Sequence, residues 1–347
     1  MLGASDAVVT WWGIERHRLA LAALAAALCA DALVRRRWPE VEWPLVALCA
    51  VLMVVDRSGR SWAERVALEA RYASRRRLTW AALRVEDESL IIDVGASSRA
   101  WCYDFVHRGR LDLADRDMAL ATRLAQFCDS LADAGQATHV AIHVGVRGSG
   151  PVRTTLSATR PAPPPPEWRR DARAGVVTSL HLGRTPILER RGYVRTPDRV
   201  LRTLRVASFA PGREAIALGR LSEQLSWLTL SMHASVVAAA RARRVTARAV
   251  HRLGSDAQVA RVAGFRWSAR REWELEIVRQ REQSVAGGSA LCRWALYLVV
   301  EGTSLAQLRS RVVQLEQLAQ AAGLRLDAGA ARQAEWYAFQ LPGGPGW

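Results

Sequence analysis

Residues 292–341 carry the pattern that most constrains the fold, a strand followed by a helix and a second strand. Residues 292–300 form an apolar strand-like run, and Ser304 with Gln307 forms a capping box that opens a helix. One face of this helix is apolar, with residues three or four positions apart: Leu305, Leu308, Val312, Leu315 and Leu318. Gly323 provides a left-handed end, and residues 324–327 are extended again. Such a unit packs its helix on a sheet, so the sequence predicts an α+β fold.

The preceding residues extend this unit into a larger domain. Strand patterns at residues 200–208 and 227–237 enclose a helix pattern at 213–225. A helical stretch follows at residues 238–283. We therefore expect a second α+β domain over residues 176–347 that is ferredoxin-like, in the order βαβ, helical insertion, βαβ.

A first small α+β domain is predicted over residues 78–148. Its expected elements are strands at 78–85, 89–94 and 98–107, a helix at 117–134 and a strand at 137–146. Residues 149–175 contain the run Pro161 to Pro166, which favours an extended, semi-rigid chain. This stretch is predicted to be a Pro/Arg-rich linker between the two domains.

Two apolar segments lie near the start, at residues 19–34 and 43–55. Tryptophans, which favour the lipid headgroup zone, stand at their margins: Trp11, Trp12, Trp38, Trp43 and Trp62. We expect residues 1–77 to form a helical membrane hairpin followed by a basic amphipathic stretch. Flanking arginines place most of the chain on the cytoplasmic side of the cytoplasmic membrane. Because both segments are short, a buried helical hairpin is the alternative.

The basic residues narrow the possible chemistry. The chain has a net charge of +16, and its 49 basic side chains are all arginine. A Walker-type loop needs a lysine to reach the transferred phosphates, so that nucleotide site is excluded. The five cysteines never form a C-x-x-C pair, which disfavours a zinc ribbon. The charge favours anionic partners, whether nucleic acid, anionic lipid or an acidic protein.

No motif for catalysis, cofactor binding or metal binding is found, and we expect the protein not to be an enzyme. His139 and His143 share one face of a predicted strand, opposite Val140, Ile142 and Val144. That face is expected to point outward, and without a third partner a metal site is disfavoured. Asp93, at a strand end, is expected to start a turn.

Four arginines form the one candidate binding feature. On a helix of about 100 degrees per residue, one face gathers Arg241, Arg244, Arg248 and Arg252, with Val245 among them. These arginines are the predicted partner-binding residues. A nucleic-acid contact and a solvated face are the alternatives.

Two segments resemble known families. The stretch from Arg332 to Gly343, Arg-Gln-Ala-Glu-Trp-Tyr-Ala-Phe-Gln-Leu-Pro-Gly, resembles the end of the N-terminal, non-ATPase region of the TraC-type conjugation ATPases of type IV secretion systems. The order of two apolar segments and then Asp56 to Glu64 resembles the PrgI family of small conjugation membrane proteins. The resemblance implies a PrgI-like hairpin fused to a TraC-like region without its ATPase domain.

These observations together predict a membrane-anchored, non-catalytic scaffold of a conjugative or type IV-like secretion apparatus. Its expected partners are secretion-system membrane proteins, a separate secretion ATPase docked at the cytoplasmic face, anionic lipid and further copies of the chain. One alternative is the two-helix membrane component of a type VII secretion complex. Another is an Arg-rich nucleic-acid-binding protein, the less favoured partner class.

Overall fold

The structure is a computed structural model, and it describes about three fifths of the chain in segments. The main described segments are residues 78–86, 89–94, 96–105, 126–129, 131–132, 138–146, 152–159, 168–170, 183–209, 226–264, 268–329 and 332–339, with single residues or pairs elsewhere. The structural statements that follow concern these residues.

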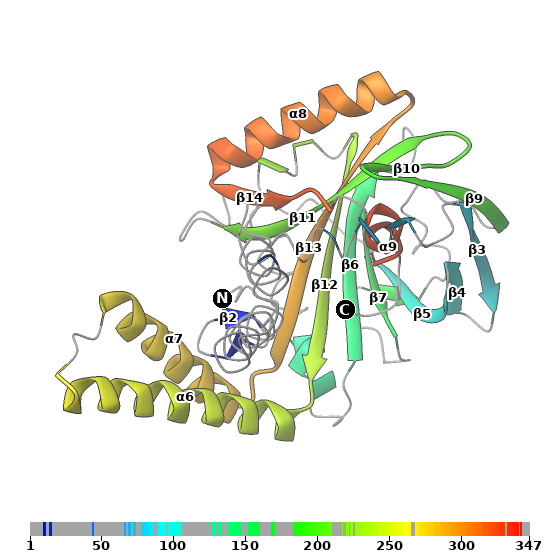
Figure 1. Cartoon of the computed structure of the whole chain (residues 1–347). Coiled ribbons are helices and arrows are strands. Elements are labelled where there is room, and N and C mark those ends of the chain that lie inside the picture. Colours follow the sequence, from blue (N-terminus) through cyan, green and yellow to red (C-terminus); the bar gives the residue numbers. More distant parts are fainter. Residues whose placement is uncertain are drawn as a thin grey trace, which may run out of the picture.

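Ten antiparallel strands form one closed sheet (Figure 1). Around the ring they are β10 (Tyr193–Arg195), β9 (Gly183–Arg190), β3 (Leu78–Glu86), β4 (Ser89–Val94), β5 (Ala96–Phe105), β7 (Val152–Ala158), β6 (Thr138–Val146), β12 (Leu228–Val237), β13 (Leu291–Gly302) and β11 (Val200–Phe209). The ring closes because β10 pairs with β9 on one side and with β11 on the other. Strands β8 (Trp168–Arg170) and β14 (Leu324–Asp327) add to β5 and β11 from outside the ring, and β1 (Thr10–Trp11) pairs with β2 (Ile14–Glu15) separately.

The predicted fold class is wrong. An N-terminal helical hairpin with two small α+β domains, the second ferredoxin-like, does not describe a closed antiparallel sheet. Strands β14, β11, β13 and β12 do lie side by side, but β11, β13 and β12 belong to the ring, so the four are not a sheet of their own. β12 also pairs with β6, where Met232 lies opposite Ile142, and β9 also pairs with β3, where Thr185 lies opposite Ala81. β7 also lies within residues 149–175, the predicted linker.

Both faces of strand β13 are buried. On β13, Leu296, Leu298 and Val300 pack outward in the core beneath helix α8 (Leu305–Ala322). Val299, next to them, points inward to a second core that β3, β4, β5, β9 and β10 share. Tyr297 also points inward. The alternating side chains of β13 therefore stabilise two different cores.

Helix α8 follows its predicted local signals. The Ser304 hydroxyl accepts a hydrogen bond from the Gln307 N–H at 3.2 Å, and the Gln307 side chain accepts one from the Thr303 N–H at 2.8 Å. Gly323 ends the helix with φ of 72°, a left-handed conformation that favours glycine. The face buried on the sheet consists of Leu308, Val312, Leu315, Ala319 and Ala322.

Helix α9 (Gln333–Phe339) lies against the inner face of the ring. Trp336 and Tyr337 are buried, at 1% and 0% exposure. The Gln333 side chain accepts from the Thr203 N–H at 2.9 Å and donates to the Thr203 carbonyl at 3.0 Å, so it is bound to the backbone of β11. A Cβ at Gly329, where φ is 56°, would lie 2.2 Å from the Trp336 ring, so only glycine fits beside that ring.

Two helices between β12 and β13 project away from the sheet as an arm (Figure 1). These are α6 (Ala239–Val262) and α7 (Ala269–Ala286), and they pack against each other. Ser268 caps α7 by accepting a hydrogen bond from the Arg271 N–H at 3.4 Å. We call this pair the α6–α7 arm.

Within the part of the chain that the structure describes, no helix is both long enough and apolar enough to span a membrane. The predicted transmembrane hairpin and the predicted location at the cytoplasmic membrane are corrected accordingly. The segments on which they depended, residues 19–34 and 43–55, lie outside the described residues except for Pro44, as does the PrgI-like stretch at 56–64.

Candidate protein-docking interface

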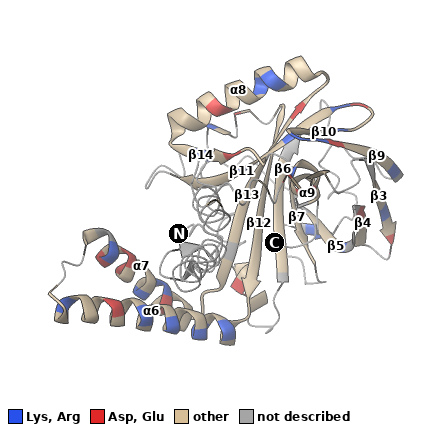
Figure 2. Cartoon of the chain, in the orientation of Figure 1, with Lys and Arg blue, Asp and Glu red and all other residues tan. Residues whose placement is uncertain are grey.

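All four arginines predicted to bind a partner lie on α6, and all four are exposed. Figure 2 shows the basic residues spread along this helix. Arg241, Arg248 and Arg252 make no ion pair with any described residue, and the Arg244 guanidinium donates only to the Ala240 carbonyl one turn back, at 3.2 Å. The four arginines therefore form an exposed helix face whose positive charges have no acidic partner among the described residues.

The arginines are poorly placed to stabilise α6 itself. The first turns of a helix carry partial positive charge, which favours acidic side chains there. The first turn of α6 has none, and Arg241, Arg243 and Arg244 stand at this end. Ala238 at the N-cap position makes no side-chain cap. Helix stability thus does not account for this arrangement.

The arm also exposes apolar side chains that the sequence analysis missed. Val259 and Val262, near the end of α6, are 67% and 83% exposed, and Trp273, in the second turn of α7, is 60% exposed. These residues lie at the tip of the arm, because the turn between the helices separates them by few residues. The spacing of Val259 and Val262 from Arg252 was the sequence signal that could have found them.

The base of the arm is fixed to the ring. The Asp129 carboxylate accepts a hydrogen bond from the Ala290 N–H at 2.7 Å, just after α7 ends. A cavity of about 120 Å³ lies beside it, lined by Val237, Ala242, Arg243, Val285 and Leu291 among others. The thiol of Cys128 is hydrogen-bonded to that of Cys292, which raises the pKa of Cys128 and lowers that of Cys292. These contacts anchor the arm at its base.

His139 and His143 do not face outward as predicted. They point into the ring, where His143 is fully buried, because Val140 and Ile142 on the opposite face of β6 pack outward with Phe127 and Leu131. His139 Nε2 lies 3.0 Å from His233 Nδ1, and His143 Nδ1 lies 2.9 Å from the Ser231 hydroxyl. The sequence analysis missed His233, which is 94 residues away from His139 along the chain.

Burial keeps these histidines neutral. It lowers the pKa of His139 to about 4, and with the charge of His139 it lowers that of His143 to about 3. The pKa of His233 is also lowered by burial. The described residues include no group of three or more side chains that could hold a metal ion. We interpret the histidines as part of the polar packing inside the ring.

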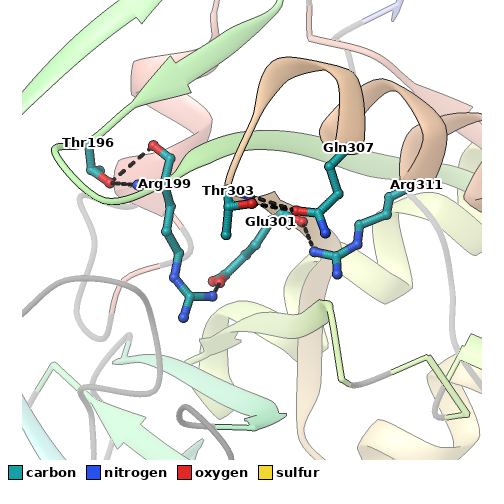
Figure 3. A network of polar contacts seen from close by, with 6 residues as sticks. All are labelled: Thr196, Arg199, Glu301, Thr303, Gln307 and Arg311. Atoms are coloured by element: carbon teal, nitrogen blue, oxygen red, sulfur yellow. Dashed lines mark hydrogen bonds and ion pairs between the residues drawn. The ribbon is translucent and has the colours of Figure 1, made fainter.

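A second polar network stabilises the junction between β13 and α8 (Figure 3). Glu301 forms an ion pair with Arg199 at 2.5 Å, while Arg311 donates to the Glu301 backbone carbonyl. Burial raises the pKa of Glu301, and the Arg199 charge opposes that shift. Every charge here has a partner, in contrast to the arginines on α6. Asp93 lies on β4 opposite Ser97, apart from both networks.

No protein-family model matches the chain, and no curated protein matches it either. The resemblance to the TraC-type and PrgI families therefore stays a prediction from the quoted segments.

Proposed function

We propose that this protein is a non-catalytic docking scaffold that binds a partner protein along its α6–α7 arm. The observation that carries the proposal is the exposed face of α6, where Arg241, Arg248 and Arg252 form no ion pair with a described residue and Val259 and Val262 are uncovered. Exposed apolar side chains also occur singly elsewhere, such as Val313 on α8 and Trp80 on β3. The arm combines Val259, Val262 and Trp273 with the four exposed arginines.

The composition of this face suits a protein partner. Arginine and tryptophan are enriched in protein interfaces and among the residues that dominate binding energy. Arg248 and Arg252 would pair with carboxylates of the partner, and Trp273 with Val262 would provide apolar contact area. A purely solvated face needs no exposed valine or tryptophan at the same end of two helices.

The resemblance to TraC-type ATPases supplies the partner for this proposal, a separately encoded secretion ATPase. Docking such an enzyme would make the chain a scaffold component of a type IV-like secretion apparatus. A membrane anchor is not part of the proposal.

Reversal of the four charges tests the proposal. Arg241→Glu, Arg244→Glu, Arg248→Glu and Arg252→Glu should together abolish co-purification of the tagged full chain with a separately encoded secretion ATPase from the same cells. The matched control reverses four exposed arginines away from the arm: Arg190, Arg195, Arg220 and Arg309.

The two variants carry the same net charge, so a loss confined to the α6 variant identifies the arm as the binding site. Undiminished co-purification by a folded α6 variant, as judged by circular dichroism, would contradict the proposal. Equal loss in both variants would mean that overall charge, and not the arm, drives association.

A further inference from the structure

We infer that the outer face of α6 binds one helix of the partner protein. That partner helix carries acidic side chains along one half of the contact and apolar side chains along the other. This inference rests on the proposed function and names the chemistry of the partner. Three observations carry it: the spacing of the exposed residues, their division into two halves, and the separate face with which α6 contacts the rest of the chain.

The spacing is that of a coiled-coil seam. Steps of four and three residues alternate along one face of α6, through Arg241, Val245, Arg248, Arg252, Ser255, Val259 and Val262, and all of these except the half-buried Ser255 are exposed. An alternation of four and three averages 3.5 residues, the repeat that keeps one narrow stripe of a helix against a neighbouring helix. The stripe runs for about 30 Å at 1.5 Å per residue. We call it the α6 seam.

The α6 seam has two chemically different halves. The first half is basic, with Arg248 and Arg252 following Arg241, and Val245 is 41% exposed among them. The last turn is apolar, since Val259 and Val262 are 67% and 83% exposed. Single exposed valines are ordinary on protein surfaces, but three at positions of one repeat are not scattered.

The contacts that α6 makes with the rest of the chain lie on another face. Ala242 and Thr246 are its buried residues, and they are offset from the seam by one position. Val285 of α7 and Ala242 border the cavity at the base of the arm, so that side of α6 is already used. The α6 seam is therefore available to a partner while the arm keeps its own packing.

Charge excludes a second copy of α6 as the occupant. In a parallel pair, Arg248 and Arg252 would face the same arginines of the other copy and repel them. In an antiparallel pair, Arg241 would face Val262, and its guanidinium would lose water without gaining a carboxylate. A helix with glutamate or aspartate opposite the basic half and leucine-like side chains opposite the valines satisfies both halves.

Synthetic peptides test the inference with the full chain. Two graded peptides, each about 28 residues long, carry a heptad repeat whose core positions are glutamate in one half and leucine in the other. One begins with the acidic half and the other with the apolar half, to allow for either helix direction. The control peptide has the same composition, with glutamate and leucine alternating along the core positions.

Fluorescence anisotropy of the labelled peptides gives the affinities. At least one graded peptide should bind with a dissociation constant below about 100 μM, and at least about tenfold more tightly than the control peptide. Arg248→Glu with Arg252→Glu should weaken it by at least about tenfold and reduce its dependence on salt. Val259→Ser with Val262→Ser should weaken it with the salt dependence retained.

The other outcomes overturn the inference. Equal binding of graded and control peptides would show attraction by charge alone. If binding is unchanged by the substitutions in both halves, the site lies elsewhere. If light scattering shows a dimer that Val259→Ser with Val262→Ser abolishes, the occupant is a second copy. The graded peptides could also show no binding while reversal of the four α6 arginines still abolishes co-purification of the ATPase. In that case the arm is the docking site, and only the inference of a helical binding segment in the partner is wrong.

Discussion

Helices α8 and α6 show how differently one chain can use a helix. α8 buries five residues on the sheet, begins with a capping box and ends at a left-handed glycine. α6 is longer, but it buries only Ala242 and Thr246, has no side-chain cap and carries basic residues at its positive end. The sequence of α8 serves folding, whereas the outer face of α6 contributes little to it. Substitutions in the ring and in the arm should therefore separate stability from binding.

The largest expected difference between the two regions is in their response to acid. In the folded ring the pKa values of His139 and His143 are about 4 and about 3, below the ordinary 6.5 of an unfolded histidine. Below pH 6.5 the unfolded chain therefore binds more protons than the folded one, so stability is greatest above pH 6.5 and falls with pH. Each of the two histidines should cost about 3 kcal/mol at pH 4.

Urea unfolding at a series of pH values between 7.5 and 4 measures this loss. A stability curve that is flat over this range would mean that the ring histidines accept protons without unfolding.

A truncation in each region gives the next largest contrast. Leu315→Ala removes a side chain with 0% exposure beneath α8 and should lower the free energy of unfolding by about 2 to 5 kcal/mol. Val259→Ala on the α6 seam should change it by less than about 0.5 kcal/mol. Chemical denaturation of both variants makes the comparison. A loss of similar size at both positions would mean that the seam is part of the folding core.

The smallest effect should be a gain in stability within the arm. Gly254 lies inside α6, and an added Cβ there would meet no atom within 4 Å. Gly254→Ala should therefore stabilise the arm by up to about 1 kcal/mol, because glycine is a poor helix former. Hydrogen exchange of α6 amides should slow in the variant while exchange in the ring stays the same. Faster exchange would indicate that the glycine fits a bend.

The sequence predicted the helices and strands better than their assembly. The limits of α8 and its cap follow from Ser304, Gln307 and Gly323, because such signals act within a few residues. The closed sheet depends on pairs such as Ser235 with His139, which are 96 residues apart along the chain, and no local pattern encodes them. The alternating pattern of β6 was interpreted as one buried face and one solvent-exposed face, so His143 was predicted to point into solvent.

The binding face was predicted in part. The arginines on α6 could be found because they recur at helical spacing in a chain whose charge drew attention to them. Val259 and Val262 were not found, because the sequence analysis looked for basic residues and both valines lie beyond Arg252, the last arginine of the predicted cluster. That these residues are exposed depends on α7 packing on another side of α6, which only the structure shows.

The position of α9 inside the ring affects how the chain reaches its folded state. Gln333 bonds to the backbone of Thr203, 130 residues earlier, so this contact closes a very long loop. Contacts of high sequence separation form late and slow folding. The inner residues of β11 and β13 thus emerge from the ribosome well before the helix that covers them. We expect the newly made chain to pass through an open, partly formed ring until α9 inserts, a stage at which its strand edges could pair with those of another chain.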